Sequence, residues 1–202
     1  LSQDLGDLRQ AIWAQTTHVT RDLNSLLNTL QNTQKQLIAS GSASGASNAI
    51  LDARDQTISE IGALVGVAVT QSASGAATVT LGRSGNGPLL GSATQTGMLE
   101  VRQGDDRLIF LAGQSPGLTE TQQVSSGQLA GLSEAYISIS ASLRTLDDLA
   151  TRLTAELNQI HANGIDLNGA IGRAMFSVDG VSIAQPPTNR SEEHTSELQS
   201  PC

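Results

Sequence analysis

The residues from Asp166 to Gly169 begin like a calcium-binding loop, with carboxylate and amide oxygens at alternate positions. Such a loop also needs an oxygen ligand at its fifth position, a glycine at its sixth and a glutamate at its twelfth. At these places the chain has Ala170, Ile171 and Ser177. The sequence therefore predicts a turn with Asn168 and Gly169 at its corner, and no metal site.

A glycine cluster invites comparison with loops that hold phosphate groups. Gly82, Gly85 and Gly87 do not have the order of either nucleotide-binding motif, and no Lys-Ser/Thr pair follows them. A strand-like run comes next, where those motifs require a helix. We therefore expect a glycine-rich hairpin turn here.

Residues for acid–base or metal chemistry are few and scattered. His18 and His161 are far apart in the sequence, and His161 lies near a predicted helix end, where a basic side chain suits the helix dipole. An acid/base pair needs two different environments for its carboxyl groups, and nothing around Asp52 and Asp55 supplies them. The sequence predicts no enzyme, no metal site and no cofactor.

Composition argues against other classes of function. The chain has 202 residues and a net charge of -8, and Lys35 is its one lysine. Binding to a nucleic-acid backbone needs clustered lysine and arginine, so no nucleic-acid partner is expected. No run of eighteen apolar residues occurs, so no membrane insertion is expected. The low aromatic content, 2%, favours long packed helices over a compact enzyme core.

Two helices are predicted in residues 1–66, the first part of a helical domain. Apolar residues recur every three or four positions from Leu1 to Leu37, which places them on one helix face. A Gly/Ser-rich loop follows, and a second helix is expected to start near Asn48 as its N-cap. Gly66 can end this helix.

The hydrophobic period changes to two in residues 67–112, which predicts a small antiparallel β insertion. Its strand-like runs are VAVTQ, ATVTLG, GMLEVRQ and DRLIFLAG. Residues 113–126 are expected to form a linker loop.

A third helix is predicted at residues 127–163, followed by an irregular extension at residues 164–189. Its apolar residues alternate steps of three and four, the heptad period of a helix that packs against another long helix. We expect the first helix to be that partner. The predicted fold is therefore α+β, with long antiparallel, coiled-coil-like helices and a small antiparallel β insertion. The helix seam comprises Leu129, Leu132, Tyr136, Ile139, Leu143, Leu146, Ala150, Leu153, Leu157 and Ile160.

Two motifs accompany these elements. The first comprises Ile50, Leu51, Asp52, Arg54 and Asp55 in the second helix, with Leu64, Val65, Gly66 and Val67 at the start of the strand. The second has the spacing Asn-x-x-His-x-x-Gly-x-Asp-x-Asn-Gly and comprises Asn158, His161, Gly164, Asp166, Asn168 and Gly169. With a β-rich segment between them, they resemble the family of bacterial flagellar hook-associated protein 1, the hook–filament junction protein.

The resemblance implies a structural subunit of the flagellum that self-assembles as a ring at the hook–filament junction. Its implied partners are further copies of itself and the neighbouring junction proteins, with an export chaperone as a further candidate. Family members leave the cell unfolded through the flagellar secretion apparatus, which implies an extracellular location. The resemblance also implies that the terminal helices, which make axial contacts, are missing from this sequence.

Two other classes stay open from the sequence. One is a coiled-coil stalk of a signalling or adhesin protein, which predicts an adjacent membrane helix or output domain. The other is a different flagellar axial protein, such as one that forms the filament itself, although the two motifs argue against it.

The last segment, residues 190–202, differs from the rest of the chain. It has neither the leucine spacing nor the Gly/Ser-rich loops, and it holds the one cysteine, Cys202. Its sequence, RSEEHTSELQSPC, resembles an in-frame translation of a widely used sequencing adapter. We interpret this tail as non-native and expect no thiol or metal function from it.

Overall fold

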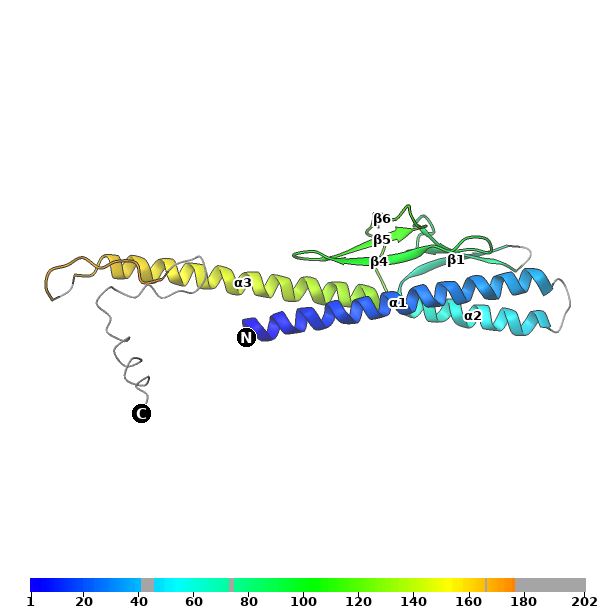
Figure 1. Cartoon of the computed structure of the whole chain (residues 1–202), viewed down its shortest axis with the longest axis horizontal. Helices are drawn as coiled ribbons and strands as arrows, with labels where there is room; N and C mark the ends of the chain where they lie inside the picture. The colour runs from blue at the N-terminus through cyan, green and yellow to red at the C-terminus, as the bar shows by residue number, and fades with distance from the viewer. Residues whose placement is uncertain (41–45, 73–74, 166, 177–202) are drawn as a thin grey trace, which may run out of the picture. The chain divides into compact units, whose positions relative to one another are not determined.

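The computed structural model describes residues 1–40, 46–72, 75–165 and 167–176 (Figure 1). The adapter-like tail and Asp166 lie outside the described residues. The chain divides into two compact units, Leu1–Leu143 and the residues from Arg144 onward. The third helix contributes its first part to one unit and its second part to the other.

The described helices are α1 (Ser2–Ser40), α2 (Ala46–Leu64) and α3 (Gln128–Ala162). One predicted detail of α2 is wrong, because Asn48 lies inside the helix and does not cap it. The helix ends at Leu64, and the Val65 amide still donates to the carbonyl oxygen of Ile61, so Gly66 directly follows the last helical turn. An N-cap side chain is worth only about 1 kcal/mol, so a single asparagine does not fix a helix boundary.

Two antiparallel sheets of three strands each follow α2. The first has the order β1-β2-β3, formed by β1 (Val67–Gln71), β2 (Ala77–Leu81) and β3 (Leu89–Gly91). The second has the order β4-β5-β6, formed by β4 (Met98–Gln103), β5 (Leu108–Gly113) and β6 (Thr119–Thr121).

Strand β6 corrects the prediction that residues 113–126 form a linker loop throughout. It pairs with β5 in the register Phe110↔Thr121 and Ala112↔Thr119. Its sequence, Thr-Glu-Thr, is short and polar, so it carries no apolar alternation that would reveal a strand. Pairing with β5 defines it, and this pairing is a tertiary contact.

The core of the first unit lies around α1. Alternate residues of β2 and β5 are buried, as the two-residue period of a strand requires when one face is covered. They meet an apolar stripe on α1, where each fully buried leucine contributes about 1.5–3 kcal/mol. The buried cluster includes Val19, Leu23, Leu27 and Leu30 of α1, Ile61 of α2, Val79 and Leu81 of β2, Phe110 of β5, and Leu129 and Tyr136 of α3.

Helix α1 has α2 along one side and the strands along the other (Figure 1). The expectation that the third helix is the long partner of α1 holds only for the first part of α3, where Arg9 of α1 lies over the Tyr136 ring (Figure 1). The more extended helix pairing of α1 is with α2. The first part of α3 joins the same core through single buried side chains such as Leu129 and Tyr136. A heptad pattern identifies a face that becomes buried, but it does not identify the partner. The α+β class itself is confirmed.

Candidate functional site: helix faces and the anchors of the β region

The first motif attaches the β1–β2 turn to α2. Arg54 is 3% exposed, and its Nε and Nη2 donate hydrogen bonds to Oδ1 of Asp55 at 2.8 and 2.6 Å. Its Nη1 donates to the carbonyl oxygen of Gly75 in the turn. A buried guanidinium needs such partners because an unpaired buried charge is unfavourable. The motif therefore acts as an internal anchor, with Leu51 packed close to Gly75 and Asp52 exposed.

Gly66 joins three segments of the first unit. Its amide donates to the carbonyl oxygen of Ser126 at 3.0 Å, and its own carbonyl oxygen accepts from the amide of Gly82 at 2.8 Å. A Cβ atom at residue 66 would lie 1.9 Å from Oγ of Ser126. Glycine suits this close approach of two chain segments, and Gly66 also directly follows the last helical bond, from the Val65 amide to the carbonyl oxygen of Ile61.

Two amide side chains of α1, which sequence reasoning missed, each hold one sheet. Asn24 donates from Nδ2 to the carbonyl oxygen of Leu99 at 2.8 Å and accepts from the amide of Leu99 at 2.9 Å. Oε1 of Gln34 accepts from the amide of Ala77 at 2.7 Å, and Gln34 is fully buried. The sequence held one sign of this role. Gln34 lies four positions after Leu30, so it is a polar residue on the apolar face of the helix.

The predicted seam of α3 has two different environments. Leu129, Tyr136 and Ile139 are buried, and the Tyr136 hydroxyl donates to the carbonyl oxygen of Gly104 at 2.9 Å. The Arg9 guanidinium lies over the Tyr136 ring, 6.0 Å from its centre. The remaining seam positions are half-buried at Leu132, Leu143 and Leu146 and exposed at Ala150, Leu153, Leu157 and Ile160.

The exposed seam residues form an apolar row in the second unit. Leu153, Leu157 and Ile160 are 57%, 40% and 68% exposed, and their spacing of four and three keeps them on one helix face. Leu149, which lies four residues before Leu153, is 60% exposed and extends the row. We call these four residues the exposed stripe.

The second motif folds the chain after α3 back towards the helix. Oδ1 of Asn158 accepts from the amides of Met175 and Phe176 at 2.8 and 3.0 Å, and its Nδ2 donates to the carbonyl oxygen of Phe176 at 2.8 Å. One asparagine side chain thus fixes the backbone of two residues beyond the helix. Asn158 has a structural role here within the second unit.

The other residues of this motif form the return. The amide of Gly164 donates to the carbonyl oxygen of His161 at 3.1 Å, and the carbonyl oxygen of Gly164 accepts from the amide of Gly172 at 2.9 Å. Gly169 has a φ of +81°, which suits the predicted turn at Asn168-Gly169. The His161 side chain is exposed.

The predicted glycine-rich turn lies between β2 and β3, where Gly82 and Gly85 have φ values of +81° and +76°. A Cβ atom at Gly87 would lie 1.8 Å from the carbonyl oxygen of Leu81. The short strand β3 follows, so this segment is a hairpin turn and lacks the helix that a phosphate-binding loop needs.

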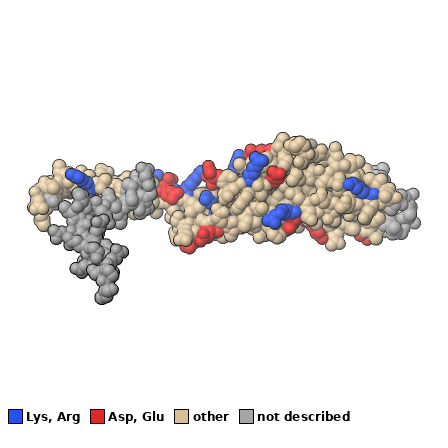
Figure 2. Space-filling view, in the orientation of Figure 1, with Lys and Arg blue, Asp and Glu red and all other residues tan. Residues whose placement is uncertain are grey.

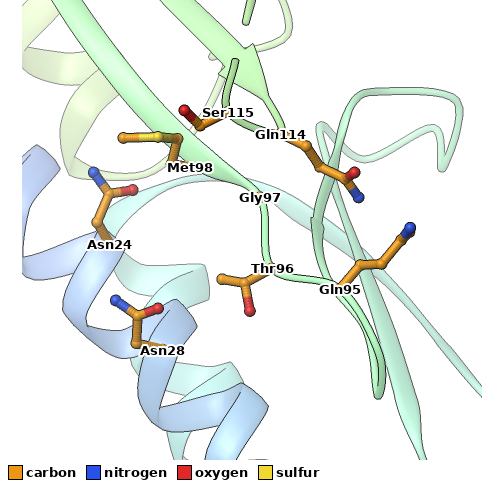
Figure 3. Close-up of a pocket in the computed structure, with 8 residues that line it drawn as sticks. All are labelled: Asn24, Asn28, Gln95, Thr96, Gly97, Met98, Gln114 and Ser115. Atoms are coloured by element: carbon orange, nitrogen blue, oxygen red, sulfur yellow. The ribbon is translucent and has the colours of Figure 1, made fainter. Parts of the chain in front are cut away.

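A shallow hollow of about 380 Å³ lies between α1 and the second sheet (Figure 3). Asn24 and Asn28 project from α1 on one side, and the other side is formed by residues 95–97, by Met98 at the start of β4 and by residues 114–115. Its lining is neutral, and the Asn24 amide is already bonded to Leu99. The lining therefore offers no charged acid, base or activated nucleophile.

Two further kinds of site are absent from the described ranges. No group of three or more His, Cys, Asp or Glu residues there is placed to hold a metal ion. None of the described helices has the length and hydropathy needed to cross a membrane. On the face seen in Figure 2, the acidic and basic side chains are interspersed, and neither sign forms a continuous patch.

Comparisons with known proteins place this geometry in a family. A solved structure of the flagellar hook junction protein FlgK from Burkholderia pseudomallei matches with a TM-score of 0.74 and 23% identity, over 87% of this chain and 33% of that one. The chain thus spans a third of the length of that protein. A comparison with curated protein sequences gives no significant match. Residues 1–176 match the family described as the flagellar hook-associated protein FlgK helical domain. The chain therefore belongs to the FlgK helical-domain family.

Proposed function

We propose that this chain is the helical domain of a structural subunit of the bacterial flagellum at the hook–filament junction, and that it assembles through helix packing. The family match over residues 1–176 supports the flagellar role. The structural match, with a TM-score of 0.74 over 87% of this chain, supports the fold. The subunit would act through shape and packing and would carry no catalytic site.

The exposed stripe is the main observation that supports assembly through helix packing. Its four large apolar residues lie in one row on α3, and each is at least 40% exposed. Single exposed leucines are ordinary, but a row at helical spacing is typical of a face that a partner helix covers. The proposed partner that covers the exposed stripe is a helix of the assembled flagellum.

The proposed partners are further copies of the subunit, arranged in a ring, and the neighbouring junction proteins. The proposed location is extracellular, after export of the unfolded chain by the flagellar secretion apparatus, with an export chaperone as a further partner. The sequence is compatible with this route because residues 1–201 contain no cysteine. Unfolded passage therefore breaks and forms no disulfide bond within them.

The observations favour this role over the alternatives. The hollow beside Asn24 has a neutral lining and gives no support to a catalytic role. A signalling or adhesin stalk would share the heptad pattern but gives no reason for the family match.

The test compares two charged substitutions on α3 in the full-length protein of a flagellated bacterium. Leu153→Asp together with Leu157→Asp places two carboxylates in the exposed stripe. We expect loss of swimming and of filament attachment, because covering these charges with an apolar partner leaves them unpaired. Filaments are counted by electron microscopy, and the exported subunit is quantified in the medium.

The matched control is Ala155→Asp, an exposed position on the same helix about 200° away from Leu153 around the helix axis. It should leave swimming unchanged. Normal swimming of the double variant, with normal export, would exclude the stripe as an assembly surface. Circular dichroism of each purified variant checks that the helices remain folded.

A further inference from the structure

The edges of the two sheets differ in how they are protected. An edge strand presents unpaired N–H and C=O groups to any other strand, and proteins usually cover or charge such edges. The edge strands are β1 and β3 in the first sheet and β4 and β6 in the second. Within the described residues, three of these four edges are covered, charged or very short.

Strands β3 and β4 have covered edges. The edge of β3 is bonded to the following segment, with the amide of Gly97 donating to the carbonyl oxygen of Leu90 at 2.8 Å and a bridge between Gly91 and Thr96. The edge of β4 lies against α1, where the Asn24 side chain occupies both outward backbone groups of Leu99.

Strand β6 has a protected edge for another reason. It is three residues long and contains Glu120, whose Oε1 accepts from Nη2 of Arg107 at 3.1 Å. A charge in a short edge strand opposes pairing with a second chain, because the charge would have to be desolvated.

Strand β1 has none of these protections. Its sequence, VAVTQ, contains no charge and no proline. Val69 is 37% exposed, and Thr70 and Gln71 are also exposed, so the end of the strand is accessible.

The hydrogen-bond alternation shows which groups of β1 face outward. The amide of Gly82 donates to Gly66, and the amide of Ser72 donates to Ala76. Because paired and unpaired positions alternate along an antiparallel strand, the even-numbered residues of β1 bond to β2. The N–H and C=O groups of Val67, Val69 and Gln71 face away from β2. Within the described part of the chain, these outward groups have no hydrogen-bond partner, and β1 has no second neighbouring strand.

We propose that the free edge of β1 pairs with the same edge of a second copy of this chain, in an antiparallel arrangement about a two-fold axis. With the axis at Val69, this residue lies opposite its own counterpart, and Val67 lies opposite Gln71 of the second copy. Each opposed pair exchanges two backbone hydrogen bonds, which gives about six across the interface. Symmetry supplies the matched register, and the absence of charge in β1 means that no like charges oppose each other.

This pair is separate from the helix packing under the proposed function. A two-fold contact closes at two copies and does not extend into a ring or filament. It concerns copies of the subunit in solution. Two short strands bury little area, so the association is weak and needs a high protein concentration. Each copy carries a net charge of -8, so added salt should strengthen the pair by screening repulsion.

The first test needs no substitution. Amide hydrogen exchange is measured residue by residue on the full chain at low and high concentration, with a reductant present to keep Cys202 as a thiol. The amides of Ala68 and Thr70 should be protected at both concentrations, because they bond to β2. The amides of Val67, Val69 and Gln71 should gain protection only at high concentration. Fast exchange of these three at every concentration would overturn the proposal.

The second test compares lysine substitutions at two sheet edges by sedimentation of the full chain. Val69→Lys should weaken self-association about tenfold or more, since the two-fold pair brings two lysines together. Thr119→Lys, which adds the same charge at the edge of β6, should leave association unchanged. Val69→Pro removes an outward N–H without breaking the β1–β2 ladder and should act like Val69→Lys.

A third variant separates this proposal from the proposed function. Leu153→Lys changes the exposed stripe and should not affect pairing through β1. If Leu153→Lys abolishes association and Val69→Lys does not, the β1 pairing is excluded while helix packing stands. The reverse result supports β1 pairing and leaves the motility test to decide the proposed function.

Discussion

The two parts of α3 have the same apolar spacing but different surroundings. In residues 128–143, Leu129 and Tyr136 lie in the core of the first unit and are at most 1% exposed. In residues 144–162, Leu153 and Ile160 continue the heptad pattern but are 57% and 68% exposed. The contrast teaches that a heptad pattern specifies a helix face to be covered and leaves the covering element undefined.

The polar groups of the two parts differ in the same way. The Tyr136 hydroxyl bonds to Gly104, which lies 32 residues earlier, at the turn between β4 and β5. The Asn158 side chain bonds to Met175 and Phe176, which follow the helix directly. The first part of α3 is thus tied to a distant sheet, whereas Asn158 in the second part holds the chain that follows the helix.

The largest difference in stability between the two parts of α3 should appear when one leucine in each part is replaced by alanine. Leu129→Ala should lower the unfolding free energy by about 3 kcal/mol, because it removes a fully buried side chain and leaves a cavity. Leu153→Ala should change it by less than about 0.5 kcal/mol, since the side chain is mostly in water. Urea unfolding of each purified variant measures both values. Equal losses would mean that both parts are packed alike.

A smaller effect is expected from Tyr136→Phe. The ring and its apolar burial remain, but the hydrogen bond to Gly104 is lost, so stability should fall by about 1 kcal/mol. The control is Ile137→Val at the neighbouring residue, which is 44% exposed and should change stability very little. Thermal unfolding of the two variants compares them. A stability for Tyr136→Phe equal to that of the unmodified chain would show that this bond contributes nothing.

The smallest effect on global stability is expected from Asn158→Ala. This change removes the three hydrogen bonds to Met175 and Phe176, so their amides should exchange about tenfold faster or more. The urea midpoint should stay unchanged, because those bonds are local to the second unit. Hydrogen exchange and urea unfolding on the same sample give both results. A shifted midpoint would show that this end of α3 contributes to global stability.

Several features followed from short-range patterns in the sequence. The apolar spacing predicted α1 and α3, and the change to a period of two located the strands that begin at Val67. The glycines at residues 82–87 predicted a hairpin turn, which the structure contains between β2 and β3. These predictions succeeded because backbone geometry alone links residue spacing to a helix or strand face.

Other features could not be read in this way. Gln34 and Asn24 are ordinary polar residues in sequence, and their roles depend on strands 43 and 75 residues away. Gly66 follows the end of α2 as its position in the sequence predicts, but its contact with Ser126 could not be read from local spacing. Strand β6 has no apolar pattern and exists through its pairing with β5.

The sequence by itself determined the local elements, the apolar faces of the helices and the family motifs. The tertiary structure decided that α2 is the long partner of α1, that only the first part of the α3 seam enters the core of the first unit, and that β1 keeps a free edge. The physical reason is that periodicity follows from the fixed geometry of one helix or strand. Burial and pairing depend on which distant segments meet, and no local spacing encodes that choice.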